Sequence, residues 1–290
     1  MALLFTMATA CQVNKNLSSS AYAIAYSSDN DIHLSDAAGK SILKITDYDG
    51  GNGYSAWSPD GKRIAFYSKY DEKKTWSIHT INSDGTNRKR LTHKDHHWDN
   101  SPTWSPDGHK IAFAKAYRDA SEAWHYEIWI MNADGTEQQQ IPGLSGGGPY
   151  FTSDNRIVFH SQPGPSEIYI ANMDGSNLKQ LTQNEAEDWH PEVSPNGQQI
   201  AFMSNREGTH EIYVMNLDGT DPKRLTFNEL DDWYPSWSPD GSALIFSSNN
   251  DGQRQIYKMK SDGSSIQPII EGGSQAAWLK IRQKSSKITF

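Results

Sequence analysis

The sequence predicts an all-β protein, a six-bladed β-propeller whose blades are four-stranded antiparallel sheets. Three observations predict this fold class. One turn sequence recurs along most of the chain, and a second turn sequence follows it at a regular interval. No segment has the 3.6-residue hydrophobic period of a long amphipathic helix. The chain has 290 residues, a length that a single all-β domain commonly reaches.

The first repeated element is a Ser-Pro-Asp-Gly turn that follows a tryptophan. Proline presets φ at the second position of a turn, and glycine accepts the backbone angle that comes after it. An alternating run, Ile-Ala-Phe or a close variant, follows each turn and is typical of a buried strand. The full pentapeptide begins at Trp57, Trp104 and Trp237, and variants begin at Phe151 and Val193.

The second repeated element is an Asp-Gly pair between two alternating runs, which is a strong hairpin signal. These pairs are separated by 50, 40, 44 and 44 residues, and a short run ending in Leu-Thr or a similar pair completes each unit. A unit of about 40–45 residues with four short strands corresponds to one propeller blade. The pairs lie at 84–85, 134–135, 174–175, 218–219 and 262–263.

The two ends of the chain together supply one more blade. Residues 22–46 read as the second, third and fourth strands of a blade, and residues 275–280, with Trp278, read as a first strand. Pairing the two ends closes the ring and removes its exposed sheet edges, which gives six blades. We therefore expect residues 20–290 to form the propeller, although the tail Ile281–Phe290 exceeds what closure needs.

Residues 1–19 are expected to be a signal and a polar tether. An apolar run ends in small residues before Cys11, the only cysteine, and an Asn/Ser-rich stretch follows. This arrangement resembles a bacterial lipoprotein signal, in which the cysteine becomes the lipidated first residue, although no Lys or Arg precedes the apolar run. The alternative is an ordinary N-terminal tail in which Cys11 has no role.

Composition excludes several classes of protein. Asp and Glu number 35 against 27 Lys and Arg, so the net charge of −8 argues against nucleic-acid binding. No internal stretch approaches the roughly 20 apolar residues that a spanning helix needs. Ten Trp, 13 Tyr and 9 Phe are too many for a disordered chain.

The candidate binding residues lie in loops that join one blade to the next. Three of these loops, 93–100, 185–190 and 229–234, carry acidic, aromatic and histidine residues, whereas the other three are glycine-rich. Such loops share one face of a propeller, and binding residues concentrate in loops on a rigid scaffold. The candidate ligand-binding residues are His97, Asp99, Asp188, Trp189, His190, Asp232, Trp233 and Tyr234.

Structural alternatives exist for these residues. In the structural alternative the aligned acids Asp99, Asp188 and Asp232 each cap loop amides, and Trp189 and Trp233 wedge between blades. A divalent metal on histidine and acidic residues is a further alternative, but no local metal motif is present, so no cofactor is expected. The sequence Gly143–Gly147 fits the Gly-x-Ser-x-Gly pattern but lies in a loop with no helix after it, which excludes a nucleophile elbow.

The complete repeat, from Trp-Ser-Pro-Asp-Gly to Leu-Thr, resembles the propeller of the TolB family. TolB belongs to the periplasmic Tol–Pal envelope system, so the resemblance implies an exported, monomeric module, periplasmic or anchored to the outer membrane through a lipid on Cys11. It would bind an envelope protein or a glycan without catalysis of its own. The same repeat resembles that of oligogalacturonate lyase. This alternative, a polysaccharide lyase or hydrolase, implies His190 or Tyr234 as the base, with Arg206 or a metal neutralising the uronate carboxylate.

The interpretation of Cys11 leads to a direct test. If the lipoprotein signal is functional, Cys11→Ser should move the protein from the membrane fraction of its native host to the soluble fraction. Ser18→Ala, in the same polar stretch, is the matched control and should leave the fractionation unchanged. Equal fractionation of both variants would identify residues 1–19 as an ordinary tail.

Overall fold

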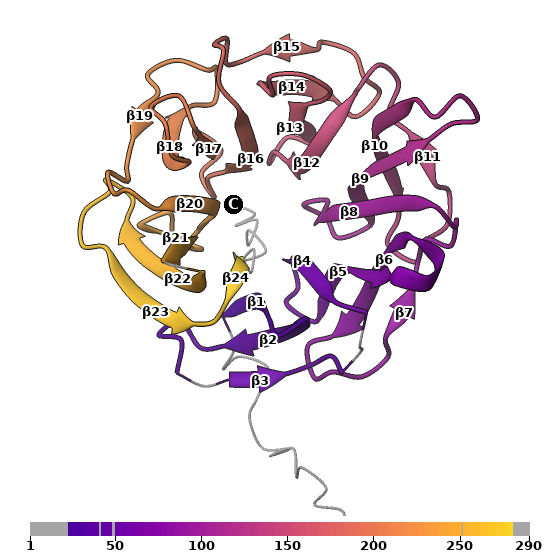
Figure 1. Ribbon diagram of the computed structural model, residues 1–290, viewed down its shortest axis with the longest axis horizontal. Helices are drawn as coiled ribbons and strands as arrows, with labels where there is room; N and C mark the ends of the chain where they lie inside the picture. The colour runs from indigo at the N-terminus through magenta and orange to yellow at the C-terminus, as the bar shows by residue number, and fades with distance from the viewer. Residues whose placement is uncertain (1–22, 41, 48–49, 251, 281–290) are drawn as a thin grey trace, which may run out of the picture.

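A computed structural model describes residues 23–40, 42–47, 50–250 and 252–280, and within these ranges the protein is built almost entirely of β-strands. The strands β1 to β24 form sheets arranged as a ring around a central axis (Figure 1). The 3-10 helix η1 (Asp71–Lys73) joins two of them. No helix in this part of the chain is long and apolar enough to cross a membrane. Cys11 lies outside the described residues.

Four of the sheets are separate four-stranded antiparallel blades. One blade combines the two ends of the described chain: β24 (Ser274–Trp278), β1 (Ile24–Ser28), β2 (Asp31–Ser35) and β3 (Ile42–Lys44). The second blade contains β12 (Gly146–Phe151), β13 (Arg156–Ser161), β14 (Ile168–Asn172) and β15 (Lys179–Gln180). The third contains β16 (Asp188–Val193), β17 (Gln199–Ser204), β18 (Glu211–Asn216) and β19 (Lys223–Arg224). The fourth contains β20 (Asp231–Trp237), β21 (Ala243–Asn250), β22 (Gln253–Lys260) and β23 (Gln267–Glu271).

The remaining strands form one eight-stranded sheet, which corrects the prediction of six separate blades. Its two antiparallel halves are joined by a single parallel bridge that pairs Trp76 with Trp98. Both bridging strands are eight residues long, so they extend far enough to meet where one half passes to the next. The halves are β4 (Asn52–Trp57), β5 (Arg63–Tyr70), β6 (Thr75–Asn82) and β7 (Lys89–Arg90), then β8 (His97–Trp104), β9 (Lys110–Arg118), β10 (Trp124–Asn132) and β11 (Gln139–Gln140).

The Ser-Pro-Asp-Gly sequence recurs because each of its residues serves the same hairpin. The Ser58 hydroxyl donates to the Asp60 carboxylate at 2.7 Å and accepts the Arg63 amide at 2.9 Å. Gly61 has a φ of 68°, which a residue without Cβ adopts at little cost. Equivalent serine-to-aspartate bonds form at Ser105 and Ser238. The turn therefore fixes where the first strand of the unit ends and the second begins.

The threonine of the Leu-Thr pair fastens the segment after the fourth strand to the third strand. In four blades a threonine hydroxyl accepts the backbone N–H that lies 14 residues earlier, at 2.9 Å each time. In one of these blades the Thr226 hydroxyl also donates to the fully buried Glu211 carboxylate. The threonines are Thr46, Thr92, Thr182 and Thr226.

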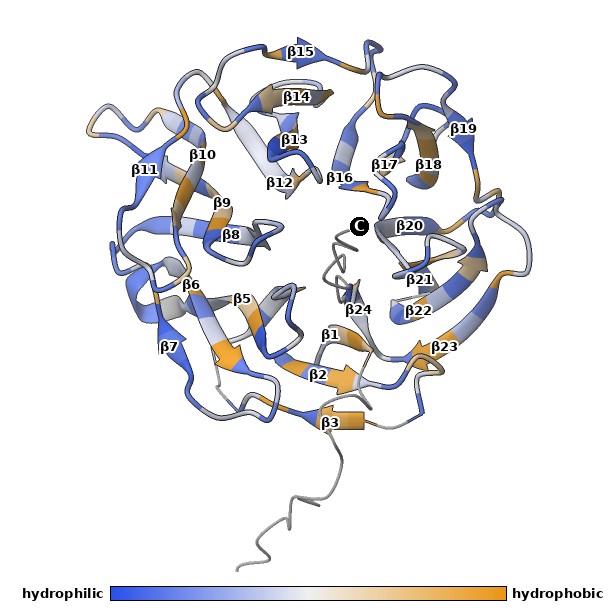
Figure 2. Cartoon of the chain, turned by 180° about the vertical axis from the view of Figure 1, so that it is seen from behind, coloured by the Kyte–Doolittle hydropathy of each residue, from blue (hydrophilic) through white to orange (hydrophobic). Residues whose placement is uncertain are grey.

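Hydrophobic clusters fill the spaces between neighbouring blades. The phenylalanine of the Ile-Ala-Phe run is at most 1% exposed at Phe66, Phe113, Phe202 and Phe246. The tryptophans that open the turns, Trp57, Trp104 and Trp237, are also buried, as their repetition predicts. The outermost strands β7, β11, β15 and β19 are hydrophilic, whereas β3 is largely hydrophobic (Figure 2).

The strand β24 pairs antiparallel with β1, with Ile24 opposite Trp278 and Ala25 opposite Ala277. The Leu279 amide extends this contact by donating to the Ala23 carbonyl at 2.7 Å. Removal of residues 275–290 should therefore expose one edge of β1 and the apolar surface that Trp278 covers, which lowers the thermal midpoint and broadens the transition.

The control for this deletion is a chain shortened only by residues 281–290, compared in the same thermal melts. If the 275–290 deletion melted as sharply and at the same temperature as the parent, the β24–β1 pairing would have no part in cooperative folding.

Candidate functional site

Each innermost strand carries one residue with a positive φ at the same place in the repeat. The angles range from 49° to 58°. The strand register shifts at this place in all six innermost strands, where three steps along the innermost strand oppose two steps along its partner. A bulge of this kind re-aims a side chain out of the regular alternation. The six residues are Tyr54, Ser101, Gly148, His190, Tyr234 and Gln275.

Three of these residues meet across the axis of the ring. The Tyr54 hydroxyl lies 3.1 Å from His190 Nε2 and donates to the Tyr234 hydroxyl at 3.2 Å. The rings of His190 and Tyr234 have centroids 4.8 Å apart. Tyr54 comes from β4, His190 from β16 and Tyr234 from β20, so the fold brings together residues that lie up to 180 positions apart. We refer to these three residues as the channel triad.

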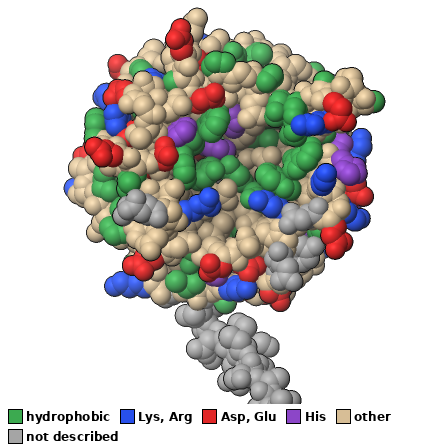
Figure 3. All heavy atoms as spheres, in the orientation of Figure 1, with side chains coloured by type: hydrophobic (Ala, Val, Ile, Leu, Met, Phe, Trp, Pro, Cys, Tyr) green, Lys and Arg blue, Asp and Glu red, His purple; other side chains and the backbone are tan. Residues whose placement is uncertain are grey.

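The channel triad lies between two cavities along the central channel. The larger cavity, of about 450 Å³, extends toward the Ser-Pro-Asp-Gly turns and reaches Pro59 and Pro106. The smaller cavity, of about 150 Å³, lies beside the glycines of β12. Tyr54 and His190 line both cavities. Seen from one face, the ring is hollowed at its centre, with hydrophobic and histidine side chains around the hollow (Figure 3).

One wall of the larger cavity carries an ion pair. The Lys280 ammonium lies 2.5 Å from the Glu192 carboxylate and donates to the Tyr150 hydroxyl at 2.8 Å. The same carboxylate accepts the Trp237 amide at 2.7 Å, so it is held by two strands. These contacts with Glu192 and Tyr150 raise the pKa of Lys280, although burial acts in the opposite direction. Glu192 and Lys280 neutralise each other, and the cavity presents aromatic hydroxyls beside them.

Burial keeps His190 and Tyr54 uncharged. Desolvation lowers the pKa of His190 to about 3 and raises the pKa of Tyr54 well above its ordinary value. The neighbouring His160 also has a pKa well below the ordinary value because it is desolvated and faces His190. At neutral pH the imidazoles are therefore neutral, and each can offer one donor and one acceptor.

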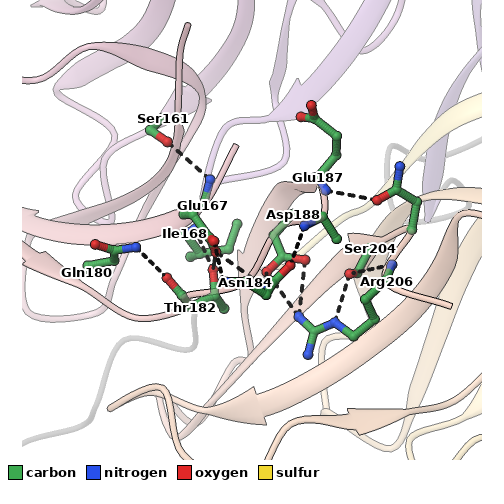
Figure 4. A network of polar contacts seen from close by, with 12 residues as sticks. Ser161, Glu167, Ile168, Gln180, Thr182, Asn184, Glu187, Asp188, Ser204 and Arg206 are labelled. Carbon is green, nitrogen blue, oxygen red and sulfur yellow. Dashed lines mark hydrogen bonds and ion pairs between the residues drawn. The ribbon is translucent and has the colours of Figure 1, made fainter. Parts of the chain in front are cut away.

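The three aligned aspartates lie inside the blades and line neither cavity. Asp188 is 0% exposed and accepts two bonds from the Arg206 guanidinium, at 3.0 and 3.1 Å, and one from the Asn184 amide at 2.8 Å (Figure 4). Asp232 accepts from Asn228 at 2.8 Å and is equally buried. Asp99 lies 3.9 Å from the Lys115 ammonium, and both are buried. These contacts hold the acids inside the blades, but the partners are side chains and not the loop amides of the capping alternative.

The predicted aromatic residues lie in different places. Trp189 is half-buried, lines the smaller cavity and stacks on His210 with centroids 5.8 Å apart. Trp233 packs beside the cluster between β16–β19 and β20–β23. His97 is buried against the ring of Tyr117, at 4.7 Å, and desolvation lowers its pKa to about 4. Of the eight predicted residues, the structure therefore brings His190, Tyr234 and Trp189 to the cavities.

Several cavity residues were missed by sequence reasoning. Tyr54, Glu192, Gln275 and Lys280 were not among the candidates. Tyr54 and Gln275 follow joining segments that were set aside as glycine-rich, and Glu192 and Lys280 lie outside the joining loops. An alignment of the repeats on the buried tryptophans Trp57 and Trp278 would have given Tyr54 and Gln275 the same repeat position as His190 and Tyr234. Within the described ranges, no group of three or more His, Cys, Asp or Glu residues is arranged to hold a metal ion.

Asp232 provides a test of the buried acids. Burial raises its pKa to about 6, against about 3.9 in an unfolded chain. A raised pKa means that the folded state favours the protonated acid, so this stabilisation is complete below about pH 4 and is lost as the pH rises through about 6. In Asp232→Asn the contribution is absent. The free energy of unfolding of the parent minus that of the variant should fall by up to about 3 kcal/mol between pH 4 and pH 7.

Urea titrations at several pH values measure this difference, and Asp218→Asn, at an exposed turn, is the control. A parent-minus-variant difference that stays constant across the pH range would mean that Asp232 is solvated in the folded protein.

Comparison with known proteins agrees with this architecture. The family model described as the TolB beta propeller domain matches residues 7–141 and 115–290. An uncharacterized protein of Agrobacterium fabrum is 28% identical over 83 residues, which are 27% of this chain and 28% of that protein. The chain therefore spans little more than a quarter of the curated relative that it matches.

Two solved structures share the fold. TolB from Acinetobacter baumannii has 22% identity and a TM-score of 0.75, and the match covers 89% of this chain and 66% of that one. A protein assigned as TolB from Agrobacterium tumefaciens has 20% identity and a TM-score of 0.70, with 88% and 91% covered. Because the family model matches nearly the whole sequence, the chain belongs to the TolB β-propeller domain family.

Proposed function

We propose that this protein is an exported, non-catalytic binding module of the bacterial envelope, which holds a macromolecular ligand, an envelope protein or a glycan, at its central channel. The observation that carries the proposal is the pair of cavities on either side of the channel triad. A pocket with apolar walls and a few convergent polar groups is the usual form of a binding site. The family membership supports a periplasmic location, and the proposed lipid on Cys11 would tether the module to the membrane.

The scaffold in this proposal is a ring of six blades. The eight-stranded sheet counts as two of them, because its halves share only the bridge between Trp76 and Trp98. The pairing of β24 with β1 closes the ring. Each of the six innermost strands then supplies one bulge residue to the channel, and the monomer contains the whole site.

The predicted site residues take two roles. His190 and Tyr234 contact the ligand directly, because they line the larger cavity, and Trp189 contacts it from the smaller cavity. Asp99, Asp188 and Asp232 position the loops from within the blades, together with the neighbouring His97 and Trp233. A ligand in the larger cavity would also reach the ion pair of Glu192 and Lys280, whose contacts are already satisfied. Binding there therefore depends on shape and on the tyrosine hydroxyls.

The test uses two tyrosines in the cavity. The full chain is incubated with solubilised envelope from its host, and a chemical cross-linker captures the partner, which mass spectrometry identifies. Tyr234→Phe and Tyr150→Phe each remove one hydroxyl that faces the larger cavity, so capture of the partner should fall about tenfold, as loss of a bond at the centre of an interface does.

The control is Tyr213→Phe, which removes a buried hydroxyl outside both cavities and should leave capture unchanged. Melting curves check that all three variants fold. Equal capture by all variants would mean that the channel is not the binding site.

A lyase is the second candidate, and the geometry favours it, because the His190 imidazole and the Tyr54 hydroxyl lie within hydrogen-bonding distance beside Tyr234. The lowered pKa of His190 makes its imidazole a weak base, so the tyrosine hydroxyls would have to share the proton transfer. Arg206, the predicted neutraliser of the substrate carboxylate, is bound to Asp188 and lines neither cavity. This candidate therefore needs a divalent metal or Lys280 in that role. Release of unsaturated products from polygalacturonate, with and without added divalent metals, tests it. Turnover that Tyr234→Phe abolishes would replace the binding proposal.

A further inference from the structure

The hairpin of β9 and β10 extends beyond the blade that follows it. Both strands have nine residues, whereas β13 and β14 in the next blade have six and five. The outer pairs of the hairpin match Arg118 with Trp124 and Ala116 with Tyr126. Trp124 is 41% exposed, which is unusual for so large an apolar side chain. The outer part of this hairpin therefore presents a face that no neighbouring blade covers.

The strand register places an aromatic wall on that face. Trp98 of β8 lies opposite Ala116, which lies opposite Tyr126 of β10. Because side chains alternate along a strand, these residues and Trp124 point to the same side of the sheet. The rings of Trp98 and Trp124 have centroids 5.0 Å apart, and those of Trp124 and Tyr126 are 5.8 Å apart and nearly parallel. We call this face, formed by the rings of Trp98, Trp124 and Tyr126 and by the alanines Ala114 and Ala116 between them, the aromatic trough.

Two alanines make the trough hollow. Ala114 and Ala116 stand where the equivalent strand β5 has Tyr67 and Lys69, as the register from the buried tryptophans shows. Both alanines line the smaller cavity together with Tyr126. Across the cavity, a Cβ on Gly147 would lie 2.7 Å from His160 Nε2, so only glycine leaves room for that imidazole. Small residues on both sides therefore keep the trough open.

The polar groups at the end of the trough are uncharged. Asn100, Gln162 and the neutral His160 line the smaller cavity and offer both donors and acceptors. Lys115 also lines it, but its ammonium lies 3.8 Å from the ring of Trp129, which is on the opposite side of the sheet. At the outer end Arg118 is paired with Glu122 at 3.1 Å, and its guanidinium lies 4.8 Å from the centroid of the Trp124 ring, so it covers part of one face of that ring. A charged ligand would therefore find no unpaired opposite charge in this part of the structure.

We infer that the aromatic trough binds a neutral oligosaccharide. One pyranose ring would lay its apolar C–H face on Trp124, outside the smaller cavity, and a neighbouring ring would place its hydroxyls in that cavity against Asn100, Gln162 and His160. The cavity of about 150 Å³ has room for one ring-sized group, and the exposed Trp124 offers a surface for a second ring. On its outer edge β10 pairs with β11 only at Trp129 and Ile130. Nearer the trough, the Ile128 amide donates to the Leu144 carbonyl and the Tyr126 carbonyl accepts from the Ser145 hydroxyl, so a loop already uses part of the edge that an added peptide strand would need. The residues of the aromatic trough do not line the larger cavity.

The experiment titrates the full chain with neutral hexamers of hexose and of N-acetylhexosamine, with polygalacturonate as the charged comparison, and follows binding by calorimetry. Trp124→Ala removes the exposed platform, and Ala116→Lys fills the trough with the residue that β5 carries at the same position. Each should weaken binding of a neutral hexamer by about tenfold or more. Phe227→Ala removes another exposed aromatic side chain, at 74% exposure, and should leave binding unchanged.

Melting curves confirm that the variants fold. The inference is overturned if no neutral hexamer binds, if polygalacturonate binds more tightly, if Phe227→Ala loses as much affinity as Trp124→Ala, or if the trough captures a peptide instead. Trp124→Ala should leave capture of an envelope protein at the larger cavity intact. Failure of the oligosaccharide titration is therefore distinguishable from failure of the proposed protein binding.

Discussion

The left-handed residue in each innermost strand is the constraint on which the site depends. Without the bulge, a strand next to the channel would present alternate side chains to the two neighbouring blades, and none would be aimed along the axis. The positive φ of Tyr54, His190 and Tyr234 brings their rings within hydrogen-bonding distance. A left-handed conformation is costly for residues with large side chains, so it persists only where the surrounding sheets over-determine it.

The surrounding sheets supply this rigidity through buried polar contacts. Asp188 links the start of β16 to Arg206, and Thr226 holds Glu211 and the amide of Ile212. A buried acid without such partners would carry a large desolvation cost, and the donors around Asp188 and Glu211 offset it. These residues do not need to touch a ligand to matter for binding, because they fix the strand ends from which His190 and Tyr234 project.

The channel and the trough have little net charge although the whole chain is acidic. Glu192 and Lys280 cancel each other in the larger cavity, and the histidines near the smaller cavity are neutral because they are buried. Recognition at these sites therefore rests on aromatic surfaces, hydroxyls and amides, which favour shape and hydrogen-bond geometry over long-range attraction. The excess acidic charge acts on solubility and on the approach of partners.

The sequence by itself determined the blade architecture, because turn chemistry and strand alternation are local properties. The Ser58 hydrogen bonds, the Asp-Gly hairpins and the buried Phe66 follow from residues close together in the chain. It also determined that His190 and Tyr234 occupy equivalent positions. Tertiary structure alone decided that Tyr54 joins them, that the aligned aspartates turn inward, and that two halves merge into one eight-stranded sheet. These outcomes depend on contacts between segments up to 180 residues apart, and on the side of a bulge to which each side chain points. A local sequence pattern contains no information about either.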